Sequence, residues 1–151
     1  MQYYGHKISK TARVFSKKLN NVLSPMGLYS SQWGILMCLH YRSTLTQVQI
    51  SNYLDVEAPT ITRTLTRLEE MGWVIRAEGE DKRERYVSLS PQAQAKFPEW
   101  LDAAIQLEKA ALRDIPEEDL ATFNRILQKM NDNLNNLQLA ESESEQDSAI
   151  S

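Results

Sequence analysis

Apolar residues recur at helical spacing at the start of the chain. The members of this first stripe lie three or four residues apart, so they share one side of a helix over residues 3–23. They are Tyr4, Ile8, Ala12, Phe15, Leu19 and Val22. Ser24, Pro25 and Gly27 follow, and residues of these types interrupt helices and form turns. The pattern predicts an amphipathic N-terminal helix that ends near residue 24.

Two shorter helices are predicted next. Residues 31–40, with Ser30 as an N-cap, are apolar on nearly all sides, which indicates a central helix. Thr46 is a suitable N-cap for a helix over residues 47–55. The expected inward side of that helix consists of Val48, Ile50 and Leu54.

A fourth helix is predicted to run to Met71, with Glu57 as its N-cap. Pro59 then falls in the first turn, where the missing N–H group does no harm. Gly72 is expected to end the helix in a left-handed conformation. The inner stripe consists of Ile61, Leu65 and Leu68.

A β-hairpin and another helix are expected after Gly72. Residues 73–78 and 85–90 have the composition and alternation of strands, and the polar residues 79–84 join them. Ser90 and Pro91 then form a helix start. Pro98 predicts a bend or a late start in this helix. Its apolar residues are Phe97, Trp100, Leu101, Ala104, Ile105 and Leu112.

The last predicted helix begins at Pro116 and carries a heptad-like seam. The seam consists of Leu120, Phe123, Leu127, Met130, Leu134 and Leu137. Such a continuous apolar stripe needs a cover, either from helices of the same chain or from a second copy. Residues 140–151 are acidic and small, so we predict a disordered tail there.

Composition narrows the class of protein. The 151 residues fit one domain or two small subdomains, and only 5 glycines and 5 prolines favour a mainly α protein with a small β-wing. A single cysteine excludes an internal disulfide, and no run of about 18 apolar residues predicts a membrane span. The basic N-terminal helix would suit a membrane surface, but a packing helix is the simpler interpretation. We therefore expect a cytoplasmic protein.

Charge is distributed unevenly along the chain, whose formal net charge is −3. Residues 1–85 hold 12 Lys and Arg against 8 Asp and Glu, whereas residues 86–151 hold 5 against 12. The halves therefore carry +4 and −7. A partner responds to the local field, so the basic half is a candidate for binding a polyanion. Two solvated faces of opposite charge are the alternative.

The fourth predicted helix concentrates this basic character on one side. With about 100° per residue, the side opposite Ile61 carries no carboxylate between Glu57 and Glu69. Arginine suits guanine, and threonine suits a thymine methyl or a phosphate. The alternative is an ordinary solvated face, although threonine is a poor helix former. The candidate DNA-binding residues on this helix are Pro59, Thr60, Thr62, Arg63, Thr66 and Arg67.

Three short helices followed by a hairpin predict a winged helix-turn-helix, in which the third helix enters the major groove. The hairpin tip adds Asp81, Lys82, Arg83 and Arg85 as candidates for the minor groove. From its position, Asp81 can fix either the arginine side chain or the turn. Thr46 and Gln47 start a helix, where backbone N–H groups bind phosphate.

The segments "TITRTLTRLEEMGWVIR" and "DKRERYVSLS" together resemble the MarR-type transcriptional regulators, and the likeness is strongest over residues 30–95. "SPQAQA" departs from the glycine that many members carry after the strand. The resemblance implies a homodimeric repressor on a pseudo-palindromic operator, released by phenolic or other lipophilic ligands. It places Pro59, Thr60, Thr62 and Arg63 at or near bases, and Arg83 in the minor groove with Asp81 orienting it.

The resemblance also divides the chain. Residues 1–28 and 91–139 would form the dimerisation region around the DNA-binding domain at residues 29–90. The expected interface residues are Tyr4, Ile8, Phe15, Leu120, Phe123, Leu127, Met130 and Leu134. The alternatives are an intrachain helical bundle and, for the whole chain, a winged-helix module that binds proteins and not DNA.

Other chemistry finds little support in the sequence. Phosphate-loop, nucleophile-elbow and zinc-protease motifs are missing, so we expect no enzyme and no cofactor. His6 and His40 are too few for a metal site, and Cys38 among apolar residues is expected to be inert packing. Trp33, Trp100, Tyr4 and Tyr29 would either line a pocket for a small aromatic ligand or belong to the core.

Overall fold

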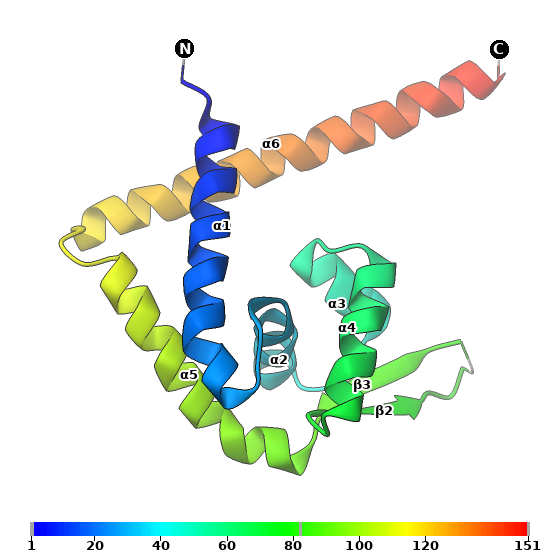
Figure 1. The fold of residues 1–151 in the computed structure, drawn as a ribbon. Coiled ribbons are helices and arrows are strands. Elements are labelled where there is room, and N and C mark those ends of the chain that lie inside the picture. Colours follow the sequence, from blue (N-terminus) through cyan, green and yellow to red (C-terminus); the bar gives the residue numbers. More distant parts are fainter. Residues whose placement is uncertain (1, 82, 151) are drawn as a thin grey trace. The chain divides into compact units, whose positions relative to one another are not determined.

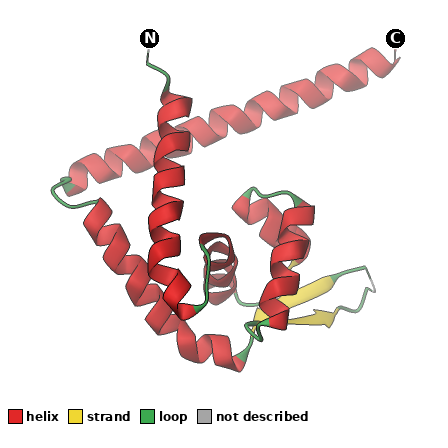
Figure 2. Ribbon diagram, in the orientation of Figure 1, coloured by secondary structure: helices red, strands yellow, loops and turns green. Residues whose placement is uncertain are grey.

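The computed structural model describes residues 2–81 and 83–150 and is mainly helical, with a small sheet (Figures 1 and 2). Residues up to Ala111 form one compact unit, and residues from Leu112 form a second. The first unit contains α1 (Tyr4–Leu23), a 3₁₀ turn (Ser24–Met26), α2 (Ser30–Arg42), β1 (Leu45–Thr46), α3 (Gln47–Leu54), α4 (Ala58–Glu70), β2 (Val74–Glu78), β3 (Arg85–Leu89) and α5 (Pro91–Ala111). The second contains α6 (Glu117–Ile150).

The core of the first unit surrounds α2, as its apolar composition predicts. Trp33, Ile35, Leu36 and Leu39 of this helix are buried together with the inner stripe of α4. That inner stripe is the predicted Ile61, Leu65 and Leu68. Phe97 and Trp100 of α5 complete the core. The core therefore holds α4 by one side and leaves its opposite side to solvent.

The sheet has three antiparallel strands in the order β1-β3-β2. β2 pairs with β3 from Val74 opposite Leu89 to Glu78 opposite Arg85, which forms the predicted hairpin. The sequence did not predict β1, whose Thr46 lies opposite Tyr86 of β3. Because Thr46 is also the N-cap of α3, the sheet fixes the start of that helix.

Hydrogen bonds join the end of α4 to the start of α5. Gly72 adopts a φ of 81°, as its predicted role requires, and the N–H of Trp73 donates to the carbonyl of Leu68 at 2.9 Å. The Ser90 hydroxyl donates to the carbonyl of Gly72 at 2.6 Å and accepts from the N–H of Ala93 at 3.1 Å. Ser90 thus caps α5 and anchors the exit of α4.

Two local predictions were wrong, and a third was confirmed only in part. Val48 was expected to face inward but is 67% exposed. So short a helix buries little of its surface, and of the three expected inward residues α3 buries Ile50 and half-buries Leu54. Ser30 lies in the first turn of α2, and the N-cap is Tyr29, whose N–H donates to the Gln32 side chain at 3.1 Å. Glu57 does occupy the N-cap position of α4, but its side chain makes no capping hydrogen bond.

The two C-terminal helices can be compared with the bend and the tail that the sequence predicts. Pro98 lies inside α5, which changes direction part-way along its length in Figure 1. α6 runs to Ile150 and so enters the segment for which a disordered tail was predicted. Its sequence contains neither glycine nor proline, the residues that most often end a helix. Within the described residues, no helix is both long and apolar enough to cross a membrane.

Candidate nucleic-acid interface

The outer side of α4 carries the basic and hydroxyl-bearing residues that the sequence predicts. Pro59, Thr60, Thr62, Arg63, Thr66 and Arg67 are all exposed. No acidic residue lies in the first turn of the helix, whereas Glu69 and Glu70 form its last two positions. The start of α4 therefore combines the positive end of the helix dipole with a first turn free of carboxylates, which suits a polyanion.

A concavity of about 800 Å³ lies between the starts of α3 and α4 and the hairpin. It brings together Thr46, Gln47, Thr62, Arg83 and Arg85 from the predicted site. Ala58, Glu84 and Tyr86 are further lining residues. Three separate segments of the chain therefore contribute predicted DNA-binding residues to one surface.

Three of the remaining predicted residues of α4 lie on its other flank. Thr60, Arg63 and Arg67 line a second concavity of about 380 Å³ together with Tyr29 and Gln32 of the α2 start. Arg63 donates from Nη2 to the Thr60 hydroxyl at 3.3 Å. Arg63 and Arg83 thus line different concavities, with α4 as the ridge between them. A helix that inserts into a DNA groove presents both of its flanks in this way.

Hydrogen bonds fix the threonine side chains of α4. The hydroxyls of Thr62, Thr64 and Thr66 each donate to the carbonyl four residues earlier, at 2.9–3.0 Å. A hydroxyl with its hydrogen engaged can accept but not donate. Phosphate oxygens only accept, so in this arrangement these hydroxyls are suited to base amino groups or to other protein donors.

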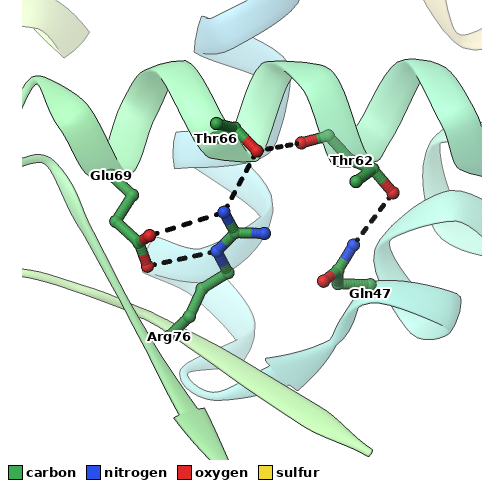
Figure 3. A network of polar contacts seen from close by, with 5 residues as sticks. All are labelled: Gln47, Thr62, Thr66, Glu69 and Arg76. Atoms are coloured by element: carbon green, nitrogen blue, oxygen red, sulfur yellow. Dashed lines mark hydrogen bonds and ion pairs between the residues drawn. The ribbon is translucent and has the colours of Figure 1, made fainter.

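Gln47, Thr62 and Thr66 belong to a polar network that Figure 3 shows. Gln47 donates from Nε2 to the Thr62 hydroxyl at 3.2 Å, which joins α3 to α4. Arg76 of β2 donates from Nη2 to the Thr66 hydroxyl at 3.1 Å and forms an ion pair with Glu69. The network connects α3, α4 and the hairpin.

The hairpin tip is held by the backbone. The N–H of Arg83 donates to Oδ1 of Asp81 at 3.1 Å, and the N–H of Glu84 donates to the Asp81 carbonyl at 2.9 Å. Of the two roles open to Asp81, the structure shows the one that fixes the turn, and the contact is to the backbone of Arg83. Arg83 and Arg85 are exposed, and the candidate Lys82 lies outside the described residues.

Tyr86 of β3 lies next to the hairpin tip, in the pair before the last of the ladder. Its hydroxyl donates to the Glu84 carboxylate at 2.9 Å. That hydrogen bond and the nearby negative charge of Glu84 raise the pKa of the Tyr86 hydroxyl. A Cβ at position 79 would overlap the Tyr86 ring, so any side chain there would displace Tyr86.

Comparison with known proteins agrees with this geometry. A model described as the MarR family matches residues 28–84, which hold α2, α3, α4, β2 and the hairpin tip. The chain is 47% identical over 121 residues to the HTH-type transcriptional regulator YwoH from Bacillus subtilis (strain 168), a match that covers 80% of this chain and 88% of that protein. This chain belongs to the MarR family.

Solved structures of MarR-family regulators share the fold. The transcriptional regulator PA3341 is 30% identical, with a TM-score of 0.80 over 89% of this chain and 99% of that one. A mutant MarR from E. coli, complexed with operator DNA, is 26% identical, with a TM-score of 0.77 over 83% of this chain and 91% of that one. Proteins of the MarR family are transcriptional regulators, so this chain is not an enzyme.

Sequence reasoning missed Arg76 and Glu69. The available signal was an arginine between apolar residues in a strand, since a charged group that is largely shielded from water needs a partner. Its partner, seven residues earlier on another element, is not apparent from periodicity. Periodicity also gave no sign that Tyr29, at the start of α2, lines the second concavity beside α4.

The aromatic residues proposed for a ligand pocket do not come together. Trp33 and Trp100 are buried core residues, whereas Tyr4 and Tyr29 are exposed. Trp100 packs edge-on against Trp73, with ring centroids 4.8 Å apart. The core alternative therefore holds for both of these tryptophans.

Cys38 is buried in α2, as expected for a packing residue. Burial raises the pKa of its thiol, and the positive charge of Arg42 offsets this in part. A basic neighbour was not expected from the sequence. A raised pKa leaves the unreactive thiol form dominant at neutral pH.

Proposed function

We propose that this protein is a homodimeric transcriptional repressor that binds a pseudo-palindromic DNA operator. The observation that carries the proposal is the surface formed by the starts of α3 and α4 and by the hairpin, with Thr46, Gln47, Thr62, Arg83 and Arg85 around one concavity. In this arrangement α4 enters the major groove, while Arg83 reaches the adjacent minor groove. The complex of the mutant E. coli MarR with operator DNA supports this assignment by analogy.

The roles of the individual side chains follow from their chemistry. Arg63 and Arg67 present guanidinium groups on one flank of α4, where guanine or phosphate would lie. Thr46 and Gln47 place the start of α3 against a phosphate. Pro59, Thr60 and Thr62 bring apolar surface and acceptor oxygens to the base edges.

Dimer formation is supported by exposed apolar surface in both units. Phe123 is 52% exposed and Leu134 is 56% exposed on α6, where Leu120, Leu127 and Met130 are half-buried. On α1, Tyr4 and Ile8 are exposed and Phe15 is half-buried. A second copy that covers these residues would hold two recognition helices about 34 Å apart, one turn of DNA.

The experiment begins with selection of bound fragments from a random DNA pool, followed by affinity measurements across a salt series. If about six to eight phosphates are neutralised, log K falls against log salt with a slope of about −5 to −7. Screening small aromatic compounds for release of the selected DNA then tests the ligand response that the family resemblance implies. Absence of any selected sequence, together with salt-independent behaviour on heparin, would favour the protein-interaction alternative.

A further inference from the structure

Arg76 occupies the centre of β2 and contacts α4 at two positions. Its Nε donates to Oε2 of Glu69 at 3.1 Å, and its Nη2 lies 3.4 Å from Oε1 of the same carboxylate. The same Nη2 donates to the Thr66 hydroxyl at 3.1 Å. The Arg76 side chain is 12% exposed and that of Glu69 is 45% exposed, so the ion pair is partly shielded from water. A two-pronged contact of this kind fixes direction as well as distance.

The contact continues along α4 to α3. The Thr66 hydroxyl donates to the carbonyl of Thr62, and the Thr62 hydroxyl accepts from Gln47 (Figure 3). In the other direction, Arg76 lies opposite Val87 of β3 in the sheet. The next pairs of that ladder end at Arg85, beside the hairpin tip. Arg76 therefore stands between the helix and the hairpin of the proposed DNA-binding surface.

We propose that Arg76 is a positioning residue that sets the hairpin, and with it Arg83, at a fixed orientation to α4. Its charge is paired with that of Glu69 across the contact between β2 and α4. The inference rests on the proposed function, because a fixed orientation matters when α4 and the hairpin must enter neighbouring grooves of one duplex.

Removing the Glu69 side chain distinguishes a positioning role of Arg76 from an effect of net charge on DNA binding. Loss of an acidic side chain near DNA should strengthen binding if only charge matters. If Glu69 instead holds Arg76 in place, its loss should weaken binding. Glu70 provides the matched control, since it is also exposed at the end of α4 and takes part in no ion pair among the described residues.

The experiment compares Glu69→Ala, Glu70→Ala and Arg76→Lys in the full chain, with DNA selected by the parent protein. Arg76→Lys keeps the charge and loses the two-pronged geometry. Glu69→Ala and Arg76→Lys should each weaken binding about fivefold, while Glu70→Ala leaves affinity unchanged or higher. Hydrogen exchange of the β2 and β3 amides in the free protein should accelerate in Glu69→Ala and Arg76→Lys, and stay as in the parent in Glu70→Ala.

A double-variant cycle with Arg83→Ala excludes a merely structural effect. A misplaced hairpin no longer delivers Arg83 to the DNA, so Arg83→Ala should cost less affinity in the Glu69→Ala background than in the parent. General destabilisation would leave that cost unchanged. Equal costs in both backgrounds, or identical behaviour of Glu69→Ala and Glu70→Ala, would overturn the proposal.

Failure of the proposed function gives a different result. In that case the parent selects no DNA, but the exchange comparison still shows whether Arg76 and Glu69 hold the hairpin. Unchanged exchange in Glu69→Ala and Arg76→Lys would then reject the positioning role by itself.

Discussion

Gln47 donates a hydrogen bond from its side-chain amide to the hydroxyl of Thr62, over 3.2 Å. The bond ties the first residue of α3 to an exposed position in the first turns of α4. Both side chains line the concavity that also contains Arg83 of the hairpin. The proposed DNA-binding surface is therefore held together by side chains that themselves take part in it, and single substitutions should reveal which of them contact DNA.

Replacing Arg83 with alanine should weaken operator binding by about 1–3 kcal/mol, because the side chain is proposed to lie in the minor groove, where the negative potential is strongest. The thermal midpoint should stay within error of the parent, since Arg83 is exposed. Titration of labelled operator and thermal unfolding measure the two effects.

Arg113 supplies the control for this substitution, since it is exposed but lies in the second unit. Arg113→Ala removes the same charge from a residue that is not among those of the proposed surface. Equal losses of affinity in the two variants would mean that Arg83 contributes only to net charge.

Replacing Arg63 with alanine should change sequence preference more than general affinity. The guanidinium of Arg63 lies near the start of α4, where base edges are expected, so its loss should relax discrimination by about 1–3 kcal/mol at the affected position. Affinities for the operator and for single-base variants of it measure this effect.

Arg67 lies one turn further along the same flank of α4 and is exposed like Arg63. It is expected to meet phosphate, so Arg67→Ala should lower affinity for all sequences alike and reduce the salt slope by about one. If Arg63→Ala keeps the full discrimination of the parent, Arg63 does not read a base.

Replacing Phe123 with aspartate should prevent dimer formation. The substitution removes an aromatic ring from the proposed interface and places a charge there, at a cost of about 3 kcal/mol or more in dimer free energy. Sedimentation equilibrium should show the weaker association, and operator binding should lose affinity with it.

Asn136→Asp provides the control for the seam. It adds the same charge to an exposed position of α6 that helical spacing places away from Leu120, Leu127 and Leu134. A Phe123→Asp variant that stays dimeric at the concentrations where the parent does would show that the seam of α6 is not the interface.

Short-range signals in the sequence predicted most of the fold. The N-cap at Thr46, the left-handed Gly72 and the helix start at Ser90 each depend on residues within one turn, and all three are present in the structure. The inner stripe of α4 was likewise predictable, because a helix buried on one side repeats its apolar residues at a fixed spacing.

Contacts between elements distant in sequence were not predictable in the same way. β1 comprises two residues and exists because β3 lies beside it. Val48 follows the apolar pattern of α3 and is nevertheless exposed, since so short a helix buries little of its surface. The predicted site lacked Arg76, because no local pattern in the sequence connects this residue to Glu69.

Cys38 should lower stability at alkaline pH. Burial raises the pKa of its thiol above the ordinary value of 9.0, whereas in the unfolded chain the thiol titrates near that value. Between the two pKa values the unfolded state binds fewer protons than the folded state, so the unfolding free energy falls as pH rises. Well below pH 9.0 the thiol is protonated in both states and contributes no pH dependence.

A Cys38→Ala variant isolates this contribution, because all other titrating groups are shared with the parent. The substitution shifts stability by a constant amount at every pH through lost packing. Denaturant unfolding from about pH 7.5 to 10 should therefore show a parent curve that declines relative to the variant only at the alkaline end. Two curves that stay parallel over the whole range would mean that the thiol keeps its ordinary pKa and is reached by solvent despite its place among the core residues of α2.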